Sequence, residues 1–205
     1  MRTSKTVLAG ILFLALLLPV KSAFPQKIFL KNDTLPAALL LIDIQEFYFP
    51  GGKLPLENPE AASEKAALVL KLFRDQKLPV IHIQHYGGSP IHASVAPLPG
   101  EKVITKMEAN AFDGTDLLEY LKSLHVKRLV LCGMQTHMCL EAATRAAYDY
   151  GFNCIVVQDA CATRSLKWGD RTVSAADVQA STLASLERFY GKVVYAADLQ
   201  FQVYK

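Results

Sequence analysis

The segment Arg128-Leu-Val-Leu-Cys-Gly-Met-Gln-Thr-His-Met-Cys139 joins an apolar run to a glycine turn and then to a helical pattern. An apolar run bounded by a turn residue is typical of a strand buried on both faces. The helical pattern starts at Thr136 and ends at Tyr150, before Gly151, a residue type that often follows a helix. A strand that leads directly into a helix is the repeating unit of parallel α/β sheets, so this segment predicts an α/β fold.

The same unit recurs along the rest of the chain. Besides the strand at 128–132, apolar runs predict strands at residues 37–42, 80–83, 103–105, 153–158 and 192–195. Further helices are predicted from Pro59, after a capping Asn58, to the stop at Lys77-Leu78-Pro79, and at residues 116–124 and 175–188. Strands that alternate with such helices imply right-handed crossovers. We therefore expect one three-layer αβα domain with a mostly parallel, Rossmann-like sheet of about six strands.

Two motifs that often accompany such a sheet are absent from the sequence. No Gly-x-Gly-x-x-Gly follows the first strand, and no Gly-x-x-x-x-Gly-Lys-[Ser/Thr] occurs. The sequence therefore gives no support for a dinucleotide or phosphate-loop site, and we expect no cofactor. Residues 87–100 are rich in proline and glycine and predict a long loop, and long loops in compact domains are often functional.

Residues 1–23 have the pattern of a secretory signal peptide. Arg2 and Lys5 precede an apolar run at 7–20, and small residues follow at Ser22 and Ala23. An uncleaved membrane anchor is the alternative, but the run is short for a span of ~20 residues. We expect export to the periplasm or the medium, with residues 24–36 as an N-terminal extension and residues 37–205 as the folded domain.

The formal net charge of +3 comes from the predicted signal peptide. That segment contains Arg2, Lys5 and Lys21 and no acidic residue, so the remaining chain is formally neutral. A neutral domain lacks the basic surface to which nucleic acids and anionic lipids bind. We therefore expect a small-molecule substrate, no nucleic-acid partner, and no stable membrane association once the signal is cleaved.

The four cysteines, Cys132, Cys139, Cys154 and Cys161, would meet an oxidising compartment after export. Cys132 and Cys154 lie inside apolar runs, where thiols are usually buried and inert. A Cys132–Cys154 disulfide between neighbouring strands is the alternative, because pairing cannot be read from sequence.

Three ionisable residues stand where parallel strands end. Asp43 follows strand 37–42, Lys106 follows strand 103–105, and Cys139 lies in the first turn of a helix that we expect Thr136 to cap. Taken singly, they could be a turn residue, a surface lysine and a buried helical cysteine. Carboxyl ends of parallel strands meet at one edge, however, and a helix N-terminus favours a thiolate and offers free N–H groups to an oxyanion. Together they predict a cysteine nucleophile, with Asp43 as its base and Lys106 as an electrostatic partner.

Four motifs in this order resemble the isochorismatase-like cysteine hydrolases, a superfamily that includes nicotinamidases, N-carbamoyl amide hydrolases and isochorismatase. They are Leu41-Ile-Asp43-Ile-Gln45, Lys106 with Asn110-Ala-Phe112, Gly133 to Cys139, and Asp159-Ala-Cys-Ala-Thr-Arg164, within a resemblance from Ala37 to Tyr195. The resemblance implies a catalytic triad of Asp43, Lys106 and Cys139. It also implies a cis Met134–Gln135 peptide, an oxyanion hole made by the backbone N–H groups of Gln135 and Cys139, and a homo-oligomer.

The sequence departs from the metal-binding nicotinamidases, which carry Asp-x-His after the second strand. This chain has His82-Ile-Gln-His85 there, and residues three apart on a strand point to opposite faces. We therefore expect no metal. The residues expected to line a substrate pocket are Phe47, His85, Tyr86, Phe112 and His137, with a structural role as the alternative for His85.

The function expected from these residues is that of an exported hydrolase that cleaves a small amide through a thioester. A vinyl-ether hydrolase of an isochorismate-like substrate is the alternative within enzymes. A non-catalytic protein that keeps the fold and binds a ligand is the alternative outside enzymes. The complete set of Asp43, Lys106 and Cys139 favours acyl transfer over both.

Overall fold

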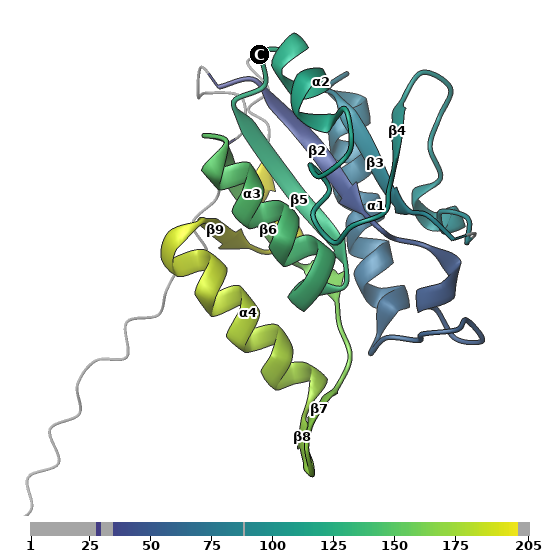
Figure 1. The fold of residues 1–205 in the computed structure, drawn as a ribbon. Coiled ribbons are helices and arrows are strands. Elements are labelled where there is room, and N and C mark those ends of the chain that lie inside the picture. Colours follow the sequence, from purple (N-terminus) through teal and green to yellow (C-terminus); the bar gives the residue numbers. More distant parts are fainter. Residues whose placement is uncertain (1–27, 30–34, 88, 201–205) are drawn as a thin grey trace, which may run out of the picture.

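The computed structural model describes residues 28–29, 35–87 and 89–200, and its main feature is a parallel sheet (Figure 1). The six strands lie in the order β4-β3-β2-β5-β6-β9, and every neighbouring pair is parallel. They are β2 (Ala37–Ile42), β3 (Val80–His85), β4 (Lys102–Lys106), β5 (Arg128–Met134), β6 (Asn153–Ala162) and β9 (Gly191–Val194). This confirms the expected αβα fold. The predicted signal peptide and most of the extension at 24–36 lie outside the described residues.

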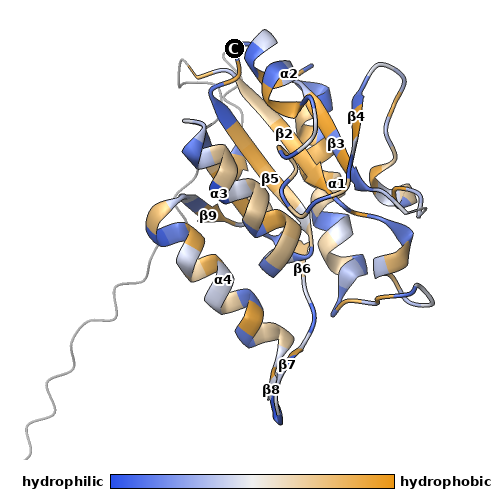
Figure 2. Cartoon of the chain, in the orientation of Figure 1, coloured by the Kyte–Doolittle hydropathy of each residue, from blue (hydrophilic) through white to orange (hydrophobic). Residues whose placement is uncertain are grey.

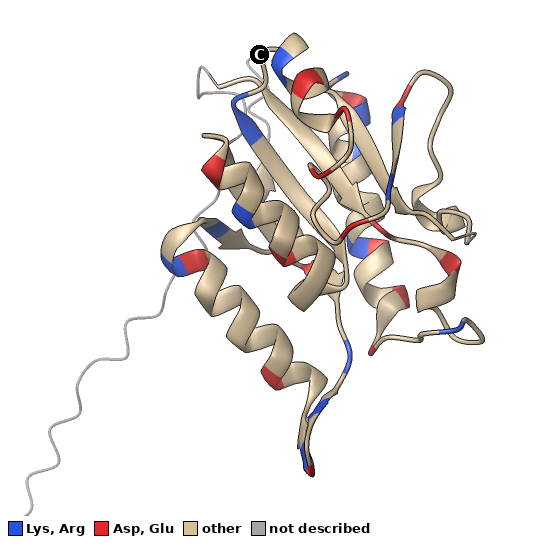
Figure 3. Cartoon of the chain, viewed as in Figure 1, with Lys and Arg blue, Asp and Glu red and all other residues tan. Residues whose placement is uncertain are grey.

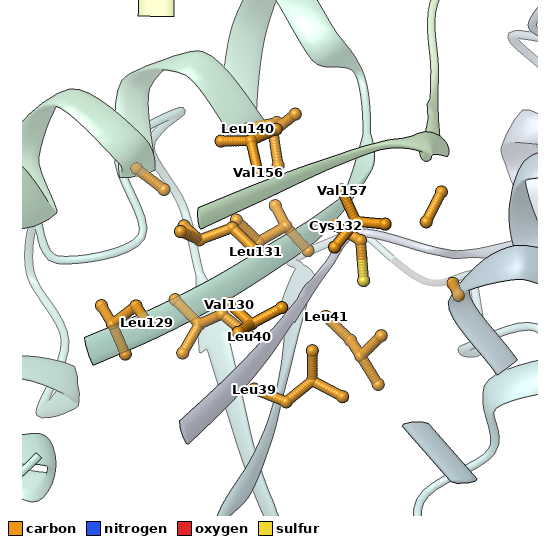
Figure 4. Close-up of a cluster of buried hydrophobic side chains, with 14 of the residues drawn as sticks. Leu39, Leu40, Leu41, Leu129, Val130, Leu131, Cys132, Leu140, Val156 and Val157 are labelled. Carbon is orange, nitrogen blue, oxygen red and sulfur yellow. The ribbon is translucent and has the colours of Figure 1, made fainter. Parts of the chain in front are cut away.

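The two central strands, β2 and β5, are apolar because both of their faces are covered. Every residue of each strand is buried. In register, Leu39 faces Val130 and Leu40 faces Leu131 (Figure 4). In the hydropathy colouring, the central strands are orange, whereas the outer faces of the helices are blue or pale (Figure 2). Side-chain burial on both faces is the reason why a continuous apolar run, and not an alternating one, encodes these strands.

Four helices cover the sheet. They are α1 (Pro59–Asp75), α2 (Leu117–Ser123), α3 (Glu141–Asp149) and α4 (Ala175–Phe189). The chain moves from β2 to β3 in one direction and from β4 to β5, β6 and β9 in the other. Right-handed crossovers therefore place α1 on one face and the other three helices on the opposite face. Figure 1 shows this arrangement, with α3 and α4 in front of the sheet and α1 behind it.

The order of the strands in the sheet reverses direction between β2 and β5, and the predicted site lies at this point. The chain leaves β2 toward β3 and β4, then returns to pair β5 with the other side of β2. Connections leave such a pair on opposite faces, which opens a crevice at the carboxyl ends of the two strands. Asp43 follows β2, and the segment from Gly133 to Cys139 follows β5. Both predicted motifs therefore flank the switch point of the sheet.

Strand β6 is longer than the prediction of residues 153–158. It runs to Ala162, and its register with β5 shifts between Leu131 and Gly133. Gln158 and Asp159 are both half-buried within this longer strand. The extension carries the chain to Thr163 and Arg164 at the carboxyl edge of the sheet.

Asn58 stands before α1 as predicted, but its side chain makes no capping hydrogen bond, and its backbone is left-handed with φ 49°.

Small elements outside the prediction are the antiparallel hairpin of β7 (Leu166–Trp168) and β8 (Arg171–Val173), and the parallel pair of β1 (Ile28–Phe29) and β10 (Leu199–Gln200). Short 3-10 turns lie at Glu46–Tyr48, Ala93–Val95 and Ala196–Asp198. None of the helices in the described ranges is long and apolar enough to cross a membrane.

The long loop between β3 and β4 is held at its far end by Glu101. The Glu101 carboxylate accepts hydrogen bonds from Arg74 Nε at 2.7 Å, Arg74 Nη2 at 2.8 Å and the Leu98 N–H at 2.8 Å. It also contacts Nε2 of the buried His82 at 2.9 Å. These contacts join α1, β3 and the loop. Although burial opposes it, hydrogen bonds led by Arg74 hold the pKa of Glu101 at about 2, while burial lowers that of His82.

We predict that Glu101→Gln lowers the free energy of unfolding by about 1–3 kcal/mol at pH 7, because the variant loses charge-assisted hydrogen bonds in a partly buried site. A carboxyl whose folded-state pKa is depressed stabilises the fold above its ordinary value of 4.5, and that contribution is lost as the pH falls toward about 2. The difference between wild type and variant should therefore shrink across this range. Urea unfolding at several pH values measures it, and a difference that does not change with pH would contradict the assignment.

Candidate active site

Asp43 occupies the turn directly after β2. Its backbone is left-handed, with φ 50°, and its N–H donates to the Ile83 carbonyl at 3.0 Å. Its side chain is 0% exposed. A carboxylate is stable in such a position only if charge or hydrogen bonding compensates its burial. The structure supplies that compensation from Lys106 and not from a local turn.

Lys106 is the last residue of β4, two strands from β2, and its side chain reaches across the carboxyl edge of the sheet. Its Nζ lies 2.8 Å from Asp43 Oδ2 and donates to Cys139 Sγ at 3.2 Å. The third contact is a hydrogen bond of 3.0 Å to the Glu108 carbonyl. These three contacts account for the three ammonium hydrogens, and the side chain is 0% exposed. The surface-lysine interpretation is therefore wrong.

Cys139 is brought to this pair by the turn after β5. The Met134–Gln135 peptide is cis, as the resemblance implied, and the next five residues, Thr136–Leu140, form a turn of π-helix that continues into α3. The expected Thr136 cap is wrong, because Gln135 takes the cap position and the buried Thr136 hydroxyl has no hydrogen-bond partner in the described chain. The nucleophile helix therefore starts with a wider turn than a regular α-helix.

Gly133 allows the two central strands to approach at the site. Its φ is +136°, and a Cβ at this position would lie 2.0 Å from the Ile42 carbonyl oxygen. No residue with a side chain fits such a contact. The same close approach places the turn after β5 beside Asp43, which follows Ile42 directly. Glycine is therefore required here for the geometry of the site.

Burial controls the ionisation of Asp43 and Cys139. Burial raises the pKa of Asp43, and the positive charge of Lys106 partly offsets this effect. Burial and the Asp43 carboxylate together raise the pKa of the Cys139 thiol to about 12, against the opposing effect of Lys106. The expectation that a helix N-terminus lowers the pKa of Cys139 is wrong, because burial and the Asp43 carboxylate raise it. The resting group is a thiol beside an Asp43–Lys106 ion pair.

Gln135, the residue after the cis bond, is 2% exposed, and both ends of its side-chain amide are engaged. Its Nε2 donates to the Tyr48 hydroxyl at 3.3 Å, and its Oε1 accepts from Arg164 Nε at 3.2 Å. The Gln135 backbone N–H lies outside both the β5 ladder and the helix that follows. It is thus placed, with the Cys139 N–H, at the start of the nucleophile helix.

Three of the five expected pocket residues, Phe47, His85 and Tyr86, line one cavity of about 610 Å³. The rest of its wall comes from Glu46, Pro50, Gly51, Gly52, Lys53, Gly87 and Ser89. His85 adjoins the triad, because it is in register with Lys106. The His85 Nδ1 lies 2.7 Å from the Tyr86 carbonyl, so Nδ1 carries the hydrogen and Nε2 is left as an acceptor.

The other two expected pocket residues lie elsewhere. Phe112 is buried against Tyr150 and Phe152, at the opposite end of α3 from Cys139, and it does not line this cavity. His137 lies beside the nucleophile, and its Nδ1 is 2.6 Å from the Thr163 hydroxyl.

His82 and His85 point to different surroundings, as expected for residues three apart on a strand. His82 is buried beside Glu101, and His85 lies at the site. Among the described residues, no group of three or more His, Cys, Asp and Glu side chains is arranged to hold a metal ion.

All four cysteines are free thiols, so the alternative of a Cys132–Cys154 disulfide is not realised.

Sequence reasoning gave no role to several residues of the site. Tyr48 and Arg164 hold the Gln135 side chain. Gln45 accepts from the His85 N–H at 2.8 Å and donates to the Ser89 carbonyl at 2.6 Å. Gln45 and Arg164 were visible only as members of the quoted motifs. Tyr48 carried no signal beyond its place five residues after Asp43.

The family model for the isochorismatase domain matches residues 37–187, three quarters of the chain and all of the site. The chain belongs to the isochorismatase family. It is therefore a hydrolase of the isochorismatase-like cysteine hydrolase superfamily, as the four motifs had suggested.

Similar proteins span nearly the whole domain. The isochorismatase family protein YddQ of Bacillus subtilis is 44% identical over 169 residues, which are 76% of this chain and 94% of YddQ. The maleamate amidohydrolase of Pseudomonas putida is 32% identical over 193 residues, with 81% and 86% covered. The crystal structure of a putative isochorismatase hydrolase from Oleispira antarctica has a TM-score of 0.78 and 42% identity, and covers 81% of this chain and 96% of its own.

Cys139 and Cys161 form a matched pair for a test of thiol activation. They are 4% and 7% exposed, and burial raises the pKa of each to about 12. Asp43 lies beside the Cys139 thiol and can accept its proton, whereas the carboxylate near Cys161, that of Asp159, accepts a hydrogen bond from the Ala196 N–H at 2.8 Å. We predict that iodoacetamide labels Cys139 at least about tenfold faster than Cys161 at neutral pH, and that Asp43→Asn removes most of this advantage.

Brief alkylation followed by peptide mapping measures both rates in one sample. Because Asp43→Asn leaves Lys106 without its anionic partner, circular dichroism must show that the variant is folded. Equal labelling of the two cysteines in the wild-type protein would contradict the activation of Cys139 by Asp43.

Proposed function

We propose that this hydrolase cleaves a small amide through a thioester on Cys139, with Asp43 as base and acid and Lys106 as electrostatic partner. One observation carries the proposal: Lys106 Nζ contacts both Asp43 Oδ2, at 2.8 Å, and Cys139 Sγ, at 3.2 Å, in a buried site. A carboxylate, an ammonium and a thiol placed in this way can move a proton and stabilise the charge that develops. The Asp43–Lys106–Cys139 triad is the arrangement implied by the family.

The first half of the reaction forms the thioester. The Cys139 thiol proton passes to Asp43 as the sulfur attacks the amide carbonyl, so that a C–S bond forms and the carbonyl π electrons move to oxygen. The backbone N–H groups of Gln135 and Cys139 donate hydrogen bonds to that oxyanion. When the intermediate collapses, the C–N bond breaks and Asp43 returns the proton to the departing nitrogen.

The second half releases the acid. Asp43 takes a proton from a water molecule, whose oxygen attacks the thioester carbonyl in the same oxyanion site. Collapse then breaks the C–S bond, and the sulfur recovers its proton. Lys106 keeps its charge throughout and stabilises whichever partner is anionic, the Asp43 carboxylate or the Cys139 thiolate.

The raised pKa values of Asp43 and Cys139 suit this cycle. A carboxylate with a raised pKa is a stronger base than an exposed aspartate, and a thiol that stays protonated at rest is not consumed by stray oxidants. The thiolate forms only when a substrate carbonyl is present to accept the sulfur. This account replaces the lowered pKa of Cys139 expected from the sequence.

The substrate class that we propose is a small amide that also carries a carboxylate. Arg164 is half-buried beside Gln135. Burial lowers the pKa of His137, and the nearby positive charge of Arg164 lowers it further. A guanidinium in this position can bind a carboxylate next to the scissile bond. A maleamate amidohydrolase is among the similar proteins, which makes maleamate, the monoamide of a dicarboxylic acid, the first substrate to test. Vinyl-ether hydrolysis is the second candidate, to be separated by the variants below.

We propose that the enzyme acts outside the cytoplasm. The support is the basic start and apolar run of residues 1–23, which lie outside the described part of the chain. Small polar amides that reach the periplasm or the medium are then the compounds to screen. Determination of the mature N-terminus after export tests this proposal, and a chain that retains Met1 or begins before residue 20 would contradict it.

The three triad members should act as a unit. We predict that Cys139→Ala, Asp43→Asn and Lys106→Met each lower kcat for amide hydrolysis on the order of 10³-fold or more. The double variant Cys139→Ala/Asp43→Asn should be scarcely slower than Cys139→Ala, because a base without a thiol to deprotonate contributes little.

Ammonia release from maleamate and from a panel of small amides and ureides provides the assay. Trapping of a Cys139 thioester by intact mass separates an enzyme from a protein that only binds its ligand. A folded Cys139→Ala variant that retains near-native turnover would exclude the thioester route and would favour vinyl-ether chemistry.

We also predict that amide hydrolysis survives chelators. His82 is occupied by Glu101, and the Nδ1 of His85 donates to the Tyr86 carbonyl, so these histidines are not arranged as a metal-binding pair. Dialysis against EDTA, followed by assay and metal analysis, should leave kcat within about twofold of the untreated enzyme. A stoichiometric metal whose removal abolishes turnover would contradict this prediction.

A further inference from the structure

The side chain of Gln135 is held from two sides by residues that are distant in sequence. Tyr48 lies in the 3-10 turn after Asp43, and Arg164 follows β6. The hydrogen bonds are 3.3 Å from Gln135 Nε2 to the Tyr48 hydroxyl and 3.2 Å from Arg164 Nε to Gln135 Oε1. Since Gln135 is 2% exposed, water cannot replace these partners without rearrangement.

Tyr48 is part of the environment of the triad, not only of the core. It is 4% exposed, and its ring packs against Phe47 with centroids 4.0 Å apart. Burial raises the pKa of the Tyr48 phenol, the hydrogen bond with Gln135 opposes this effect, and the Asp43 carboxylate raises the pKa further. The hydroxyl therefore stays protonated, and its oxygen accepts from Gln135 Nε2. A phenylalanine would fill the same space without offering this acceptor.

We infer that Tyr48 and Arg164 are positioning residues that fix Gln135 so that its backbone N–H points to the oxyanion. This inference rests on the proposed function, in which that N–H stabilises the tetrahedral intermediate. The side chain of Gln135 is anchored at both ends of its amide, so rotation of the residue about its backbone is restricted. An oxyanion donor is effective only if its direction is set before the reaction, because reorganisation during the reaction costs free energy.

Two reactions of the Cys139 thiol distinguish an effect on the oxyanion site from an effect on the thiol itself. Acylation of Cys139 by p-nitrophenyl acetate forms a C–S bond, places the carbonyl electron pair on oxygen and then expels p-nitrophenolate, so it passes through an oxyanion. Alkylation by iodoacetamide displaces iodide at a saturated carbon and forms no oxyanion. Both need the Cys139 thiol to lose its proton. The ratio of the two rates therefore reports oxyanion stabilisation alone, and the acetyl probe carries no carboxylate for Arg164 to bind.

We expect Tyr48→Phe to lower the p-nitrophenolate burst rate about tenfold, less than the 10²–10³-fold that follows loss of an oxyanion donor, while alkylation stays within twofold. Tyr148→Phe is the matched control, because it removes a hydroxyl from a half-exposed tyrosine of α3 and should change neither rate. Gln135→Leu keeps the backbone N–H but loses the bonds to both Tyr48 and Arg164, and should lower acylation at least as much as Tyr48→Phe. Adding Tyr48→Phe to Gln135→Leu should then have no further effect.

The outcomes distinguish this inference from the proposed function. A wild-type protein whose Cys139 is alkylated but never acylated would refute the thioester route, and the positioning role with it. A wild-type protein that is acylated, together with an unchanged rate ratio in Tyr48→Phe, would refute the positioning role alone. An equal loss of both rates would show that Tyr48 acts on the thiol and would also overturn the inference. If Tyr48→Phe fails to fold, Gln135→Leu gives the same comparison.

Discussion

The buried ion pair of Asp43 and Lys106 is the interaction on which the rest of the site depends. Both side chains are fully buried, and removing two charges from water costs several kcal/mol per ion unless they are paired and hydrogen-bonded. Lys106 meets that requirement with three contacts, one of them to the Cys139 sulfur. The pair therefore joins β2, β4 and the start of the nucleophile helix, so the site depends on the packing of all three elements.

The close approach of the two central strands explains why the site lies where it does. Gly133 lets the turn after β5 pass against Ile42, and the reversal of strand order between β2 and β5 opens the crevice above them. Charged residues mark other parts of the surface, but most of the ribbon near the central strands is uncharged (Figure 3). The charges of Asp43 and Lys106 are desolvated, which strengthens their interaction with each other and, in the proposed mechanism, with a developing oxyanion.

Two further contacts hold the loop between β3 and β4 beside the site. Glu101 fixes its end to α1 and β3, and Gln45 joins its beginning to the turn after β2 through the Ser89 carbonyl and the His85 backbone. Tyr86, Gly87 and Ser89 of this loop line the 610 Å³ cavity together with residues of the segment 46–53, so contacts outside the triad hold its wall in place.

The sequence by itself determined the order of strands and helices and the three chemical groups at the strand ends, because each depends on local periodicity and on the few residues that follow a strand. Only the tertiary structure decided which strands are neighbours, the extension of β6, the π-helical start at Thr136 and the raised pKa of Cys139. These features depend on desolvation and on contacts between distant segments. The bond between Tyr48 and Gln135, which joins residues 87 positions apart, has no local signature, because hydrogen bonding across the site follows from strand order and not from sequence spacing.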